Sequence, residues 1–426
     1  MKKFFIFAVL VLTSGAFIGL IVDEGVNSTT MTGGDERGQL MWGIVDCIVV
    51  LVCFFHCRQL VRVASRQPWI LAFVGWATLS LAWSDFPMLT LRRVAGLICT
   101  MALGFLLGMR LEMKPLLRLL AWALAFTMPA SLIAALFFPA FGLMHRLDAV
   151  GWRGVFSHKN GLGNAMGIAL IAFACLLWES RRKPLRYILP LVTGLGLLAL
   201  SRSMTSIVVT LLTLSIGCYL RLRLRPAHKV ALYALALVAA LGVGLFLNGR
   251  MHSVFALVGR DSSLTGRIPL WHFSANAMLE RPLLGSGWDA FWPGKGGDKI
   301  RNLVRWPAPH AHNGFLELGL NVGLIGLAIF LVAYYRSFRL ALRYSNDPTQ
   351  PLRLWPLLFY SYTLLSNFTE APPIDRHTLT FLLFCSLSVS MTETFAVEAI
   401  EHEREPDMPY LPFAVESNAG IIQESL

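Results

Sequence analysis

The sequence predicts an all-α polytopic membrane protein with about 12 transmembrane helices and one large loop, itself containing helices, on the outer side of the membrane. Hydrophobic residues make up 55% of the 426 residues and charged residues only 15%. The mean hydropathy of +0.59 is too high for a soluble domain. Apolar windows recur along the chain, and lysine and arginine gather in every second connection between them.

Each predicted span is a run of apolar residues with few charges, and several fall short of the roughly 20 residues that a membrane-crossing helix needs. The spans are Lys3–Ile21, Leu40–Phe55, Trp69–Trp83, Val94–Met109, Pro115–Phe138, Gly161–Trp178, Tyr187–Leu200, Met204–Leu220, Val230–Leu247, Gly314–Tyr334, Leu354–Ser366 and His377–Met391.

The basic residues indicate the orientation. Alternate connections are rich in lysine and arginine, as in Arg181-Arg182-Lys183 and Arg221–Arg225, which places them and both termini on the cytoplasmic side. Loops facing anionic lipid account for most of the net charge of +12, so nucleic acid is not expected as a partner. The first apolar segment resembles a signal peptide, but it lacks a clear small-x-small cleavage site. We interpret it as an uncleaved first helix.

The chain is expected to form one membrane domain, residues 1–391, followed by an acidic, flexible cytoplasmic tail, residues 392–426. None of the seven cysteines falls in a predicted outer loop, which argues against disulfides and against a zinc site there. The large outer loop is predicted at about residues 248–312. It should hold a helix that is capped near Ser262, Ser263 or Thr265 and runs to about Leu284. The tryptophans that follow suit an interfacial belt and sugar stacking equally well.

A second feature of this loop is the motif Pro309-His-Ala-His-Asn313, which leads into an apolar helix. A helix N-terminus favours an anion such as a diphosphate, and a neutral histidine there is able to take a proton from a hydroxyl. His312 is therefore the candidate base, with His310 and Asn313 in support. Glu317, one turn deeper, is a candidate because intramembrane carboxylates are costly. The plain alternative is that both histidines only solvate a helix end, and a metal site at His310-x-His312 is a further option.

Two more polar clusters fall on the predicted outer side. The first holds Arg153, His158, Lys159 and Asn160 before an apolar helix, and its alternative is an ordinary basic loop. The second is the turn at Arg202, whose arginine has the alternative of reaching lipid headgroups. Arg267 begins the loop helix, and Arg92 and Arg93 also lie outside. Arginines that break the charge rule on one face suggest an anionic ligand there.

These clusters together resemble the O-antigen ligase and exopolysaccharide polymerase superfamily. The motifs that carry the resemblance are Arg153-Gly-Val-Phe-Ser-His-Lys-Asn160, Ser201-Arg202-Ser203, Thr265-Gly-Arg267 with Trp271, Pro282-Leu-Leu-Gly-Ser-Gly287, and His310-Ala-His312-Asn313 through Gly323. His312 and Gly323 match the family's pattern of histidine, ten residues and glycine. The ligase pattern of arginine, three residues and leucine is not met after Arg267. The Phe-Ser-His-Lys-Asn-Gly form is most similar to the exopolysaccharide polymerases.

The resemblance implies a glycosyltransferase that polymerises polyprenyl-diphosphate-linked oligosaccharide repeat units at the periplasmic face of the bacterial inner membrane. Transfer would invert the anomeric centre without a metal or cofactor. His312 would activate the acceptor hydroxyl of the growing glycan, while Arg153, Arg202 and Arg267 would hold the diphosphate. Flippase and chain-length or export proteins would be partners, with membrane lipid around the chain. The alternative within the class is an O-antigen ligase that transfers lipid-linked glycan to a lipid A core. A membrane transporter is disfavoured, since few charges lie in mid-span and no internal repeat is visible.

Overall fold

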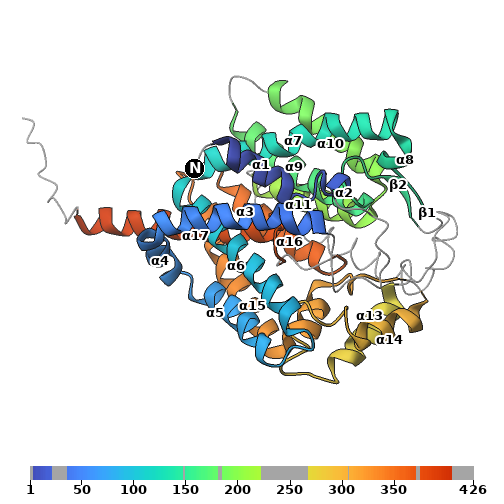
Figure 1. Cartoon of the computed structure of the whole chain (residues 1–426). Coiled ribbons are helices and arrows are strands. Elements are labelled where there is room, and N and C mark those ends of the chain that lie inside the picture. Colours follow the sequence, from blue (N-terminus) through green and yellow to red (C-terminus); the bar gives the residue numbers. More distant parts are fainter. Residues whose placement is uncertain are drawn as a thin grey trace, which may run out of the picture.

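The computed structural model describes residues 3–21, 36–146, 149–180, 185–221, 267–305, 307–370 and 375–404. Nearly all of these residues are helical (Figure 1). The elements, in chain order, are α1 (Lys3–Thr13), α2 (Ile18–Ile21), α3 (Glu36–Phe55), α4 (Cys57–Ser65), α5 (Pro68–Leu79), α6 (Pro87–Arg110), α7 (Met113–Phe137), α8 (Pro139–Gly142), β1 (Leu143–Arg146), β2 (Ala149–Trp152), α9 (Lys159–Glu179), α10 (Leu185–Ser201), α11 (Met204–Arg221), α13 (Arg267–Met278), α14 (Lys295–Val304), α15 (Gly314–Asn346), α16 (Leu354–Asn367) and α17 (Leu379–Arg404).

The chain is a multi-pass membrane protein. Among the described residues, seven helices are long and apolar enough to cross a bilayer: α3, α6, α7, α9, α11, α15 and α17. Shorter apolar helices lie at 3–13, 68–82 and 185–201. The ninth predicted span, Val230–Leu247, lies outside the described residues, so the count of about 12 stays a prediction.

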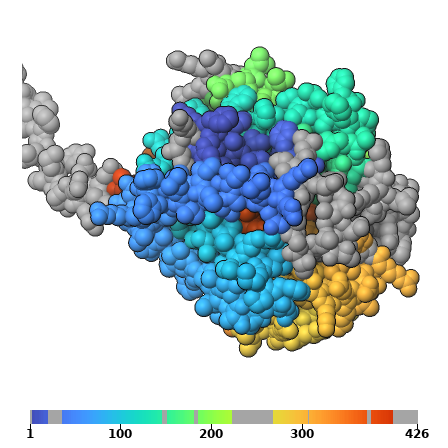
Figure 2. All heavy atoms as spheres, viewed as in Figure 1, coloured from blue at the N-terminus to red at the C-terminus, as the bar shows by residue number. Residues whose placement is uncertain are grey.

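The helices form two packed groups that share α16. In one group α9 is the central helix and contacts α7, α10, α11 and α16. In the other, α6 packs along α17, and α15 packs against α5 and α17. Gly104 and Gly108 bring the backbones of α6 and α17 together, because a side chain at either position would meet Leu382, Cys385 or Ser386. By contrast α3 lies along the surface, and Figure 2 shows it crossing the visible face.

The connections between helices form two sets, one at each end of the helix bundle, and the members of a set contact one another. At one end, Arg66 pairs with Glu393 at 2.8 Å, and Glu179 lies 3.5 Å from Lys114. At the other end lie the hairpin β1–β2 and the pair α13–α14, opposite α4 and the far end of α17 (Figure 1). Among the described residues, the predicted cytoplasmic loops around Arg66 and Lys114 fall in the first set and the candidate site loops in the second. This grouping supports the predicted alternation of the loops.

Three predicted boundaries are corrected. The first apolar segment is not one helix: it breaks after Thr13, and Phe17 N–H donates to the Val155 carbonyl at 2.8 Å. The segment predicted as a flexible tail is helical as far as Arg404 in α17. The residues before the 153–160 cluster form a short antiparallel hairpin, β1–β2, a departure from the all-α prediction.

We expect the end that carries α13 and α14 to face the periplasm. In a cysteine-free background, cysteine at the exposed Asn302 of α14 should react with a membrane-impermeant thiol reagent in spheroplasts. Cysteine at the exposed Thr349, in the loop after α15, should react only after the membrane is permeabilised. The reverse pattern would overturn the predicted orientation.

Candidate functional site

The outer loop is joined to α15 at a break within that helix. Gly323 has φ 68° and ψ −176°, so the backbone hydrogen bonds of α15 are interrupted there. The segment 282–287 fills the break. Ser286 N–H donates to the Leu320 carbonyl at 3.0 Å and Gly287 N–H to the Asn321 carbonyl at 2.9 Å, while Leu324 N–H donates to the Pro282 carbonyl at 2.7 Å. These contacts explain the glycines of the 282–287 segment and Gly323, because the segment and the break complete each other's hydrogen bonds.

His310 and His312 lie in a tight turn before α15, so His312 precedes the N-cap and does not stand in the first turn of the helix, where it was predicted. Asn313 is the N-cap, and its side-chain oxygen accepts N–H bonds from Phe315 at 3.0 Å and Leu316 at 3.1 Å. His312 has a left-handed backbone with φ 49°. Its N–H donates to Nδ1 of His310 at 3.1 Å, and the two rings lie 4.0 Å apart. This bond leaves the His310 proton on Nε2.

Glu370, in the loop after α16, gathers the site around its carboxylate. Oε1 accepts from Nη2 of Arg267 at 3.0 Å and from Nδ2 of Asn160 at 3.0 Å. Oε2 lies 3.8 Å from Nδ1 of His312, an ion-pair distance that exceeds hydrogen-bond range. Arg267 also donates to the Thr205 hydroxyl at 3.3 Å. Three segments that are distant in sequence therefore meet at the Glu370 carboxylate, and Arg267 links Thr205 to them.

Burial and neighbouring charges determine which side chains of this cluster are ionised. Burial raises the pKa of Glu370, but the neighbouring His312 and Arg267 outweigh it and lower that pKa to about 2. Burial and the neighbouring His312 lower the pKa of His310 to about 3. Glu370 is thus ionised and His310 neutral at neutral pH. Because the unfolded chain binds a proton at His310 more tightly than the folded protein does, the free energy of unfolding decreases as pH falls from about 6.5 to about 3.

The predicted basic residues lie at different places. Arg153 donates from Nε to the Phe141 carbonyl of α8 at 2.5 Å and from Nη1 to the Ser157 carbonyl of its own loop at 3.3 Å, so it connects that loop to α8. Arg202 is exposed in the tight turn between α10 and α11, with φ 51°. The convergence of Arg153 and Arg202 with Arg267 on one anionic pocket stays a prediction.

His158 and Lys159 lie beside the cluster. Nδ1 of His158 caps α9 by accepting the Asn160 N–H at 3.1 Å. The stem of Lys159 lies over Gly151, whose backbone also approaches the Ser201 carbonyl. The 153–160 loop and the 201–203 turn are therefore neighbours, and Asn160 links the first of them to Glu370.

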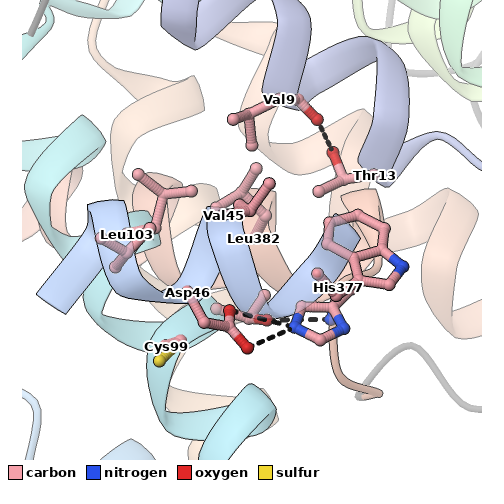
Figure 3. Close-up of a pocket in the computed structure, with 11 residues that line it drawn as sticks. Val9, Thr13, Val45, Asp46, Cys99, Leu103, His377 and Leu382 are labelled. Carbon is pink, nitrogen blue, oxygen red and sulfur yellow. Dashed lines mark hydrogen bonds and ion pairs between the residues drawn. The ribbon is translucent and has the colours of Figure 1, made fainter. Parts of the chain in front are cut away.

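A second polar cluster joins α3 to the start of α17 (Figure 3). Nε2 of His377 lies 3.0 and 3.1 Å from the two carboxylate oxygens of Asp46, and its ring stacks on Trp42 with centroids 4.2 Å apart. In the same loop Arg376 pairs with Asp289 at 2.9 Å. The cluster fixes the far end of the loop that carries Glu370.

Arg92 and Arg93, the two further arginines predicted on the outer side, both lie within α6 and not in a loop. Arg93 pairs with Asp289 at 3.1 Å, and Arg92 donates to the Gln39 side chain at 2.6 Å. Arg93 was one of the charges that suggested an external anion. Its partner in the structure is a carboxylate of the protein itself, that of Asp289.

Sequence reasoning did not identify Glu370 or Asp46. Each carried a signal: Glu370 is an acidic residue in a short outer loop, and Asp46 is a carboxylate within an apolar run. Within the described part of the chain, no three His, Cys, Asp or Glu side chains are arranged as metal ligands.

Comparison with known proteins places these residues in a family context. Residues 189–331 match the family described as O-antigen ligase, a range that includes Arg202, Arg267, His310, His312 and Glu317. An exopolysaccharide production protein of Rhizobium meliloti, ExoQ, is 28% identical over 312 residues, or 66% of this chain and 67% of that protein.

Shorter matches cover a smaller part of the chain. Proteins of Rickettsia conorii and Rickettsia prowazekii, provisionally named polysaccharide ligases, are 38% and 35% identical over 82 residues. These matches cover 18% of this chain and 20% of each relative. A chain from a solved peptidoglycan synthase complex aligns with a TM-score of 0.43 and 16% identity, covering 80% of this chain and 97% of that one. At that level the likeness carries no information about the site.

Proposed function

We propose that the chain is a membrane enzyme of the O-antigen ligase family and that it polymerises polyprenyl-diphosphate-linked oligosaccharide repeat units into exopolysaccharide at the periplasmic face of the inner membrane. The observation that carries the proposal is the cluster of His312, Glu370, Arg267 and Asn160 at the loop-bearing end of the bundle. The likeness to a protein named for exopolysaccharide production supports a polymer as the product.

The cluster suits His312 to act as a general base. Nδ1 is the ring nitrogen of His312 that lies 3.8 Å from the ionised Glu370, so we assign the imidazole proton to Nδ1, which leaves Nε2 to accept a proton. The acceptor hydroxyl gives its proton to Nε2 as its oxygen forms a bond to the anomeric carbon. The bond from that carbon to the diphosphate breaks, and the polyprenyl diphosphate leaves with the bonding electrons. In-line attack of this kind inverts the anomeric centre.

The leaving diphosphate needs cations beyond Arg267. The charge of Arg267 is offset by Glu370, to which it is bound. Lys159 and Arg202 lie in the two neighbouring segments, and Arg153 follows the hairpin beside them. We assign them to the leaving group, with Arg267 setting the position of Glu370 and supplying a second N–H face to the site.

Arg267→Lys should lower the turnover of purified protein on lipid-linked donor by about 10–100-fold. An ammonium cannot hold both Glu370 and the Thr205 hydroxyl in fixed directions, and a charge-assisted hydrogen bond is worth about 1.5–3 kcal/mol. Arg281→Lys is the matched control, because Arg281 is exposed and pairs with Asp85 at the surface. Equal rates for both variants would exclude this role for Arg267.

A ligase is the second candidate, since the family description and the two Rickettsia relatives carry that name. Deleting the gene and separating the cell's glycans by size distinguishes the two. Loss of long chains, with single repeat units left on lipid, is expected for a polymerase. Long chains that persist but are not joined to lipid A core would identify a ligase instead.

A further inference from the structure

Glu317 is a buried carboxylate that the proposed transfer does not use. It lies in the first turns of α15 and is 6% exposed. Oε2 accepts the Ala311 N–H at 2.8 Å and the Trp292 indole N–H at 2.8 Å. Oε1 accepts from the Asn321 side-chain amide at 3.0 Å. All three partners are N–H donors, so both carboxylate oxygens are occupied by the protein itself.

One of these donors belongs to the turn that holds His312. Ala311 is fully buried and lies between the two histidines, and its N–H has a carboxylate as its acceptor. On the far side of the turn, Asn313 fixes the chain as the N-cap of α15. His312 is therefore held between two anchored main-chain positions, and its left-handed backbone depends on both.

We infer that Glu317 is a positioning residue: its carboxylate holds the Ala311 main chain and so sets the place of the His312 ring relative to Glu370. The inference rests on the proposed role of His312 as the base. Glu317 also binds Trp292, so the same carboxylate ties the Gly- and Trp-rich loop to the histidine turn. Glu317 therefore connects the Gly- and Trp-rich loop, the histidine turn and α15.

Glu317→Gln tests this with almost no change of volume. Asn321 cannot turn its amide to help, because its Oδ1 already accepts the Phe291 N–H at 3.3 Å. Whichever way the Gln amide points, its NH2 group faces an N–H donor, either from Asn321 or from Ala311 and Trp292. If the NH2 group faces Asn321, the Gln oxygen still accepts the Ala311 N–H but more weakly than a carboxylate does, and in the reverse orientation that bond is lost. The variant therefore weakens the anchor in either orientation and leaves the histidine in the chain.

The experiment is a double-mutant cycle with His312→Ala, measured with purified full-length protein on lipid-linked donor. Glu317→Gln should lower kcat by about 10-fold or more and change KM less than about threefold, because positioning matters most in the transition state. Added to His312→Ala, it should lower the rate no further, since it acts only through the histidine. Trp292→Phe is the control: it removes one donor, leaves Ala311 bound and should stay within a few-fold of wild type.

Losses that multiply in the double variant would overturn the inference, as would a rise in KM without a fall in kcat. A fall in kcat matched by an equal loss in Trp292→Phe would assign Glu317 to loop packing and reject the positioning role. Glu317→Asp, which keeps the charge but is one methylene shorter, replaces Gln in the same cycle if the Gln variant does not fold. Full activity of His312→Ala would instead refute the proposed base, a different outcome from any of these.

Discussion

His312→Ala should fold and insert normally yet lose about 10²–10⁴-fold in turnover, the usual contribution of a positioned acid–base group. The ring is 13% exposed and lies outside the helices, so its removal leaves no large cavity in the core. His312→Asn is the stricter variant, because asparagine tolerates the left-handed backbone that this position adopts. The measurement is the rate of repeat-unit transfer by purified protein, together with its thermal unfolding midpoint.

The neighbouring histidine gives the comparison. His310 is neutral at working pH, and its Nδ1 accepts the His312 N–H. His310→Ala should therefore lower turnover less than His312→Ala does, while affecting the same transfer step. Added chelator should leave the wild-type rate unchanged if transfer needs no metal. Unchanged turnover in both His312 variants would remove the base from the mechanism, and inhibition by chelator would favour a metal at His310-x-His312.

Gly323→Ala should prevent folding of the outer half of α15. The φ and ψ of this residue fall in a region that essentially only glycine occupies, and an added Cβ would overlap the Leu283 carbonyl. The variant must also lose some of the hydrogen bonds that seat segment 282–287 in the break. We expect a destabilisation of about 3 kcal/mol or more, seen as a loss of monodisperse protein and a lower unfolding midpoint in detergent.

Gly196→Ala is the matched control for this substitution. Gly196 lies in α10 with open space around its Cα, so alanine there meets nothing and should be neutral or stabilise by about 0.5–1 kcal/mol. A Gly323→Ala protein that unfolds at the wild-type temperature would show that the break in α15 does not need glycine.

The helices were predictable from sequence because their signal is local. Apolar runs and the alternation of basic loops located α6, α9 and α15, with errors of a few residues up to about twelve at their ends. The break after Thr13 falls at Thr13-Ser14-Gly15, which is too short an interruption to end a span by pattern alone, and the chain is held there by pairing with Val155 and Phe156 far along the sequence. Local pattern does not report such long-range contacts.

Some residues of the candidate site were predictable from the sequence, and others were not. His312, Asn160 and Arg267 stand in recognisable motifs at the ends of apolar runs. Glu370 is 58 positions from His312 in sequence and has no motif, and only the packing of α16 against α9 and α15 brings its loop to the cluster. The contacts of Arg153 were equally invisible in the sequence, since its guanidinium binds the Phe141 carbonyl of α8, across the β1–β2 hairpin.

The docking of segment 282–287 into the break of α15 has a consequence for building hybrid enzymes. Exchanging the outer loop between relatives would pair a foreign segment with a resident helix whose exposed backbone groups are matched to another partner. Residues 282–287 and 314–326 form one cassette, and a graft that carries both across together keeps their hydrogen bonds. A graft cut between them leaves unpaired backbone groups at membrane depth.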